Sequence, residues 1–206
     1  RQPDVSHALR MGRLRKLAHA QSLALSATIR LHQVKYPQRT GVPPVDRGML
    51  MLYNFGHLGA ETERSSIFNL PDAERYTSYI AAYTLPIDMA LPMFSWLVHG
   101  RDGNVMGLLE KVELSDLESS DAFARESSGR YVAERSLYFR GQYFMEGDRV
   151  VIEETTPAVT QQAAELAARS AAPHRPYATV ALFDLDERNL SHYATADLQK
   201  IFAAFH

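Results

Sequence analysis

Four short apolar runs, each followed by polar or aromatic residues, constrain the fold of this chain more than any other feature. They span residues 25–31, 49–52, 87–91 and 178–183. Continuous apolar runs of this length are typical of parallel strands that helices bury on both faces. Because binding and catalytic residues of α/β folds collect at the carboxyl ends of such strands, the pattern also indicates where a site should lie.

Segments with helical periodicity separate the four runs. Residues 6–21 and 70–83 repeat apolar side chains every three to four positions. Thr156 is followed by proline, which is a typical helix start, and another helix is expected from about Thr195. Alternating strands and helices predict an α/β fold of parallel β/α units. Four such units make half of an eight-fold barrel, and a small open doubly wound sheet is the alternative.

The middle of the chain departs from this alternation. Residues 97–109 contain the turn sequence Arg-Asp-Gly-Asn and predict a hairpin. Residues 137–144 and 149–154 flank a second turn, so we expect them to pair as a second hairpin, with at most short helical turns before them. The sequence therefore predicts a single α/β domain over residues 1–206, with an insertion at about 97–154.

Composition excludes several classes of function. The 206 residues carry a formal net charge of −2 and no cysteine. The overall charge gives no reason to expect a nucleic acid as partner, and thiolate metal sites, disulfides and a cysteine nucleophile are excluded. No apolar stretch approaches the roughly 20 residues of a membrane span. Motifs for phosphate loops, dinucleotides, serine hydrolases and metals are missing from the sequence, so we expect no cofactor and no metal.

Two longer stretches resemble a known family. Residues 28–56 (TIRLHQVKYPQRTGVPPVDRGMLMLYNFG) and 85–109 (LPIDMALPMFSWLVHGRDGNVMGLL) resemble the later strands of uncharacterised, glycoside-hydrolase-like (β/α)8 proteins of the bacterial envelope and lipoprotein type. The resemblance extends over roughly residues 5–205. It implies that the chain supplies strands five to eight, the C-terminal half of a barrel, and that it is periplasmic or bound to the cell envelope. It assigns no role to any individual residue.

Acidic residues are the first candidates for chemistry. Asp184 and Asp186 follow the last apolar run, and Glu154 ends the segment before it. Glycoside hydrolysis needs two carboxyl groups, roughly 5–5.5 Å apart for retention of configuration or 6.5–9.5 Å for inversion. Asp184 is therefore the first candidate for the acid or nucleophile, with Glu154 or Asp186 as its partner. The alternative is that Asp186 is an ordinary loop residue and that Glu154 begins a solvated turn.

The second group of candidates would bind substrate. Sugar rings stack their C–H faces on aromatic side chains, and their hydroxyl groups bond to amides and carboxylates. These residue types occur at the ends of three runs: His32 and Gln33, Tyr53 and Asn54, and Ser95 and Trp96. A single tryptophan is also often a core residue, which is the alternative for Trp96.

Three functions fit these patterns. The first is a carbohydrate-active, glycoside-hydrolase-like enzyme with a polar and aromatic cleft at the strand ends. The second is a non-catalytic carbohydrate-binding or scaffold protein of the cell envelope. The third is an open-sheet domain whose insertion contacts another protein through Tyr138, Phe139 and Tyr143. A half-barrel exposes two strand edges, so we also expect a partner, either an N-terminal half-barrel fragment or a second copy.

Overall fold

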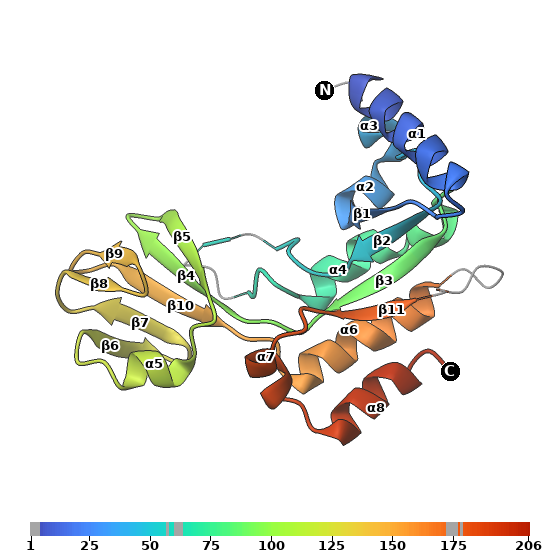
Figure 1. Cartoon of the computed structure of the whole chain (residues 1–206). Helices are drawn as coiled ribbons and strands as arrows, with labels where there is room; N and C mark the ends of the chain where they lie inside the picture. The colour runs from blue at the N-terminus through green and yellow to red at the C-terminus, as the bar shows by residue number, and fades with distance from the viewer. Residues whose placement is uncertain (1–4, 57, 60–63, 172–176, 178) are drawn as a thin grey trace.

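The computed structural model describes residues 5–56, 58–59, 64–171, 177 and 179–206. Figure 1 shows two parts. A parallel sheet with its helices lies on the right, and an antiparallel sheet that belongs to one long insertion lies on the left. The insertion leaves the parallel sheet after its third strand and returns at the start of a helix. The carboxyl end of that strand is therefore where the two parts meet.

The parallel sheet has four strands in the order of the sequence. They are β1 (Ser26–Arg30), β2 (Arg47–Met51), β3 (Ile87–Pro92) and β11 (Val180–Phe183), with neighbours paired in parallel. The helices and turns around them are α1 (Val5–Ala20), α2 (Leu31–Lys35), α3 (Pro37–Thr40), α4 (Leu70–Thr77), η1 (Ile80–Ala82), α6 (Pro157–Ser170), α7 (Glu187–Ser191) and α8 (Thr195–Ala203).

Strand order and helix contacts identify this sheet as half of a (β/α)8 barrel. A doubly wound sheet reverses its strand order at a switch point, and the order β1-β2-β3-β11 has no reversal. Helix α2 contacts α4, α4 contacts α6, and α6 contacts α8, so the helices form one continuous layer. Right-handed crossovers in a sheet without reversal put every helix on the same side. The predicted half-barrel is confirmed, and the open doubly wound alternative is wrong.

Local sequence explains where the helices begin. Asn69 caps α4 by accepting a hydrogen bond from the backbone amide of Asp72 (3.2 Å). Thr156 caps α6 in the same way, through Val159 N (3.4 Å), and proline takes the first helical position. The helix expected over residues 70–83 ends early, at Thr77, and continues as the short turn η1. The loop expected after β1 also contains the short helices α2 and α3.

The core lies between the parallel sheet and the helices. Ile29, Leu50, Met89 and Leu91 are fully buried there. Gly48 is required by this packing, because a Cβ atom at its position would lie 2.6 Å from Cγ1 of Ile29. Close packing of this kind leaves little room for a larger residue without a shift of neighbouring side chains.

The insertion is a second sheet with its own core. Its strands are β4 (Trp96–Arg101), β5 (Asn104–Glu110), β6 (Phe123–Ser127), β7 (Arg130–Ala133) and β10 (Arg149–Glu153), in the order β5-β4-β10-β7-β6. A short helix, α5 (Leu114–Glu118), and a small hairpin of β8 (Leu137–Phe139) and β9 (Gln142–Phe144) pack beside it. The β4–β5 hairpin is the one predicted from the sequence, and its turn residues Asp102 and Gly103 both have positive φ.

The second predicted hairpin is wrong in its pairing. Strand β8 pairs with β9 around Arg140 and Gly141, whose φ angles are 49° and 81°. Positive φ at both central residues is what a two-residue hairpin turn needs. Strand β10 instead pairs with β4 and β7, at the centre of the five-stranded sheet. Helix α5 agrees with the short helical turns predicted before this hairpin, whereas strands β6 and β7 were not predicted there.

Candidate functional site

A cavity of about 280 Å³ opens at the carboxyl ends of β2, β3 and β11. We call it the strand-end cleft. The insertion closes one side of it with three residues: Trp96, which begins β4, Glu110, which ends β5, and Lys111, which follows it. The residues lining it are Met51, Tyr53, Asn54, Phe94, Ser95, Trp96, Glu110, Lys111, Phe183, Asp184 and Asn189. The structure thus brings together Tyr53, Asn54, Ser95, Trp96 and Asp184, which the sequence placed at three separate strand ends.

Four aromatic rings in contact form the apolar part of the cleft. The rings of Tyr53 and Phe183 are stacked, with centroids 5.2 Å apart and planes 8° apart. Phe94 meets Tyr53 edge to face at 5.5 Å, and meets Phe183 in the same way at 5.9 Å. Trp96 lies edge to face against Phe94 at 5.4 Å. Phe183 is 47% exposed, so its ring is open to a ligand.

Asp184 is the acidic group on the β11 side of the cleft. Its Oδ1 atom accepts a hydrogen bond from Nδ2 of Asn189 (2.5 Å). Burial, together with the negative charge of Asp184, raises the pKa of the Tyr53 hydroxyl to about 12. The Tyr53 hydroxyl therefore stays protonated at neutral pH and keeps a proton to donate.

Asp186 has a structural role. Its side chain caps α7 by accepting from the backbone amide of Arg188 (3.0 Å), and it pairs with Nζ of Lys111 (2.8 Å). The hydrogen bond from Lys111 and the one from that amide hold the pKa of Asp186 below its ordinary value. Arg188 also donates to the backbone oxygen of Lys111. Asp186 thus ties α7 to Lys111, a residue of the cleft lining that follows β5.

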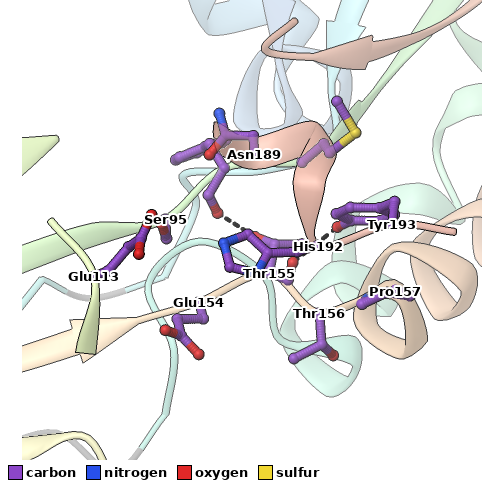
Figure 2. A pocket seen from close by; sticks show the side chains of 11 residues that line it. Ser95, Glu113, Glu154, Thr155, Thr156, Pro157, Asn189, His192 and Tyr193 are labelled. Carbon is purple, nitrogen blue, oxygen red and sulfur yellow. Dashed lines mark hydrogen bonds between the residues drawn. The ribbon is translucent and has the colours of Figure 1, made fainter. Parts of the chain in front are cut away.

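Glu154 lines a neighbouring cavity of about 190 Å³, which we call the side pocket (Figure 2). Figure 2 shows Glu154 and Glu113 on one side of it and His192 and Tyr193 on the other. The side pocket shares Phe94, Ser95 and Asn189 with the strand-end cleft, so the two cavities adjoin. The remaining lining residues are Met93, Thr155, Thr156 and Pro157.

His32 and Gln33 lie away from this arrangement. Both are in α2, which begins directly after β1. The Gln33 side chain accepts a hydrogen bond from the backbone amide of Arg30 (2.8 Å), and so closes the first turn of that helix. Neither residue belongs to the lining of the strand-end cleft or the side pocket. The sequence put them at a strand end, but β1 ends at Arg30 and both residues lie in the helix that follows it.

Six of the residues that line the cleft are not among the site candidates from the sequence, and one of them is Phe94, an aromatic residue just after the third apolar run. Phe183 is the last residue of a predicted strand, so its place at the strand-end edge of the sheet was predictable. Glu110 and Lys111 come from the insertion, and only the pairing of β5 with β4 brings them to the cleft. Met51 ends β2, and Asn189 lies in the short helix α7, which the sequence pattern did not predict.

Two kinds of feature are not found in the part of the chain that the structure describes. No group of three or more His, Asp or Glu side chains is placed to hold a metal ion there. No helix in the same part is both long and apolar enough to cross a membrane.

The fold is similar to that of known glycoside hydrolases. No protein-family model and no curated protein sequence matches the chain. A chitinase from Chromobacterium violaceum aligns over 96% of this chain and 60% of its own, with 13% identity and a TM-score of 0.51. The spore cortex-lytic enzyme SleL of Bacillus cereus aligns over 98% of this chain and 47% of its own, with 10% identity and a TM-score of 0.54.

A third similar structure contains a bound compound. Group IV chitinase of Ostrinia furnacalis, in complex with allosamidin, aligns over 95% of this chain and 60% of its own, with 13% identity and a TM-score of 0.52. This chain therefore has the fold of part of a chitinase-type barrel and spans about 60% of the chitinase chains that it matches. At these identities the similarity concerns the fold.

Proposed function

We propose that this chain binds a glycan of the N-acetylglucosamine type in the strand-end cleft. The stacked Tyr53 and Phe183 rings, with polar groups around them, carry the proposal. A pyranose ring packs its C–H face on an exposed aromatic ring, and the amide and carboxylate groups of Asn54, Asp184 and Asn189 suit its hydroxyl groups. The similarity in fold to chitinases supports the choice of glycan.

Binding is the activity proposed here, and hydrolysis is the alternative that the cleft carboxylates keep open. Hydrolysis commonly uses two carboxyl groups that face the scissile bond, although one acid is enough where the N-acetyl group of the substrate acts as the nucleophile. Asp186 caps a helix and pairs with Lys111, and Glu154 lines the side pocket instead of the cleft. Among the described residues, the carboxylates that line the cleft are those of Asp184 and Glu110. Asp184 with Glu110 is therefore the pair to test if turnover is found.

The first test measures binding. Trp96 is the only tryptophan of the chain and lines the cleft, so its fluorescence reports on the site directly. We expect the tetramer of N-acetylglucosamine and allosamidin to change the Trp96 emission in a saturable way, while a glucose tetramer of the same linkage does so weakly. Equal responses to both tetramers would contradict the choice of glycan, and no response to any of the three would contradict the proposal.

A second measurement separates binding from catalysis. We expect no release of reducing ends when the native chain is incubated with the N-acetylglucosamine tetramer, and we expect Asp184→Asn to bind it within about threefold of the native chain, since an amide still makes hydrogen bonds there. Release of reducing ends that Asp184→Asn abolishes would show instead that the cleft is catalytic.

A further inference from the structure

Glu153, the last residue of β10, is a buried acid outside both cavities. Its side chain is 7% exposed, and one carboxylate oxygen, Oε2, lies within hydrogen-bond distance of five donors. These donors are Ser66 Oγ (2.7 Å), Ser66 N (2.8 Å), Trp96 Nε1 (3.2 Å), Ser65 Oγ (3.3 Å) and Ile67 N (3.3 Å).

The donors come from two different parts of the molecule. Trp96 is the first residue of β4 and lies opposite Glu153 in the antiparallel pairing of β4 with β10. Ser65, Ser66 and Ile67 belong to the segment that precedes α4. That segment is bonded to the chain just after β2, through Asn54 N to Ile67 O (2.9 Å) and Gly56 N to Ser66 O (3.2 Å). One carboxylate thus joins the insertion to the segment that carries Tyr53 and Asn54.

This arrangement holds a hydrogen-bond acceptor at the indole nitrogen of Trp96. An indole N–H can only donate a hydrogen bond, so the orientation of a buried tryptophan depends on where an acceptor is held. Here the acceptor is fixed by the Ser66 amide and hydroxyl, which make its two shortest bonds. Bonds to an ionised acceptor are stronger than those between neutral groups, and a buried carboxylate is costly unless it is bonded in this way.

We propose that Glu153 is a positioning residue, which sets the orientation of Trp96 and holds the insertion wall of the cleft against the β2 wall. The expected effect of Glu153 on glycan affinity rests on the proposed function. Its expected effect on the orientation of Trp96 is independent of that function. Because all five bonds converge on one oxygen, a glutamine can place its single carbonyl oxygen at the same point. A leucine of similar size offers no acceptor there.

The experiment compares Glu153→Gln and Glu153→Leu with the native chain, and uses Glu146→Leu as the matched control. Glu146 is an exposed acid in the connection between β9 and β10. Two quantities are measured: quenching of the Trp96 fluorescence by iodide, and affinity for the N-acetylglucosamine tetramer. A variant is included only if its circular dichroism spectrum matches that of the native chain.

We expect Glu153→Leu to raise iodide quenching at least about twofold and to weaken tetramer binding about tenfold, the effect of losing one bond to a charged group. Glu153→Gln is expected to restore both quantities to within about threefold of the native values, since its carbonyl oxygen still accepts hydrogen bonds. Glu146→Leu should match the native chain. A purely structural role would lower stability in both Glu153 variants without a selective change at Trp96.

Native quenching in Glu153→Leu would overturn the proposal, and so would equal damage from the two Glu153 variants. If Glu153→Leu does not fold, Ser66→Ala takes its place, because it removes the donor of the shortest bond and leaves the acceptor intact. Unchanged quenching in Ser66→Ala then overturns the proposal. If the native chain does not bind the tetramer, the proposed function fails while the quenching results still decide the role of Glu153.

Discussion

Replacing Asp148 with alanine is expected to lower the free energy of unfolding by about 3–5 kcal/mol, the usual effect of breaking a buried ion pair. Asp148 is 2% exposed and precedes β10 in the core of the insertion. Its carboxylate bonds Arg101 through two nitrogens (both 2.7 Å), His99 Nε2 (2.7 Å) and the backbone amide of Met145 (2.7 Å). The alanine variant would leave the buried His99 ring and the partly buried Arg101 guanidinium without their acceptor.

Chemical denaturation measures this effect, and Asp121→Ala is the matched control. Asp121 also pairs with an arginine, Arg135, but both side chains are more than half exposed. Exposed pairs contribute about 0–1 kcal/mol, so the control should unfold almost as the native chain does. Similar midpoints for the two variants would show that the Asp148 cluster does not stabilise the insertion.

The same cluster predicts how stability depends on pH. Burial alone would raise the pKa of Asp148, but the hydrogen bonds from Arg101, Met145 and His99 outweigh it and lower the pKa to about 2. The folded pKa lies below the unfolded value of about 3.9, so the stabilisation is complete above pH ~4 and is lost as the pH falls toward 2. We expect acid unfolding of the native chain in this range, with a smaller pH dependence in Asp148→Ala.

Replacing Phe183 with alanine is expected to weaken glycan binding by about ten- to a hundredfold, as loss of a central aromatic contact does at binding sites. Phe183 stacks on Tyr53, meets Phe94 edge to face, and is 47% exposed at the cleft. Because nearly half of its surface already faces solvent, the change should cost little folding stability. The measurement is calorimetric titration with the N-acetylglucosamine tetramer.

Two further variants make the Phe183 result specific. Phe183→Tyr keeps an aromatic ring at the cleft and should bind within a few-fold of the native chain, since the stacking surface is retained. Tyr138→Ala removes an exposed ring that contacts Tyr143 on the small β8–β9 hairpin, away from the cleft. Native affinity in Phe183→Ala, or an equal loss in Tyr138→Ala, would contradict the assignment of the glycan to the strand-end cleft.

Features set by neighbouring residues were predictable from the sequence. The strands β2 and β3 follow from continuous apolar runs, and the start of α6 follows from a cap residue with a proline beside it. The β4–β5 hairpin follows from its Asp-Gly turn. In each case, the residues that determine the structure lie within a few positions of one another, so their interactions are visible in the sequence pattern.

Pairing between distant segments was not predictable in the same way. Strand β10 has the apolar composition of many strands, and nothing within it specifies pairing with β4 and β7 in preference to β9. The two-residue turn at Arg140 and Gly141 pairs β8 with β9 in the small hairpin. Strand β10 therefore pairs with β4 and β7 in the larger sheet. Pairing depends on which surfaces the whole chain can bury together, which a local pattern does not contain.

Parallel β/α units and three of the strand ends that meet in one cleft were predictable from the residues, whereas the choice of a half-barrel over an open sheet came from the strand order and the helix contacts. Parallel strands with helical crossovers must place their carboxyl ends on one edge, so Tyr53, Trp96 and Asp184 were predictable as neighbours. The contacts of each acid, in contrast, became known from the folded chain. Asp186 became a helix cap, Glu154 a wall of the side pocket, and Glu153 the acceptor for Trp96. The physical reason is that the role of a carboxylate depends on the donors and charges around it, and these come from segments far apart in the chain.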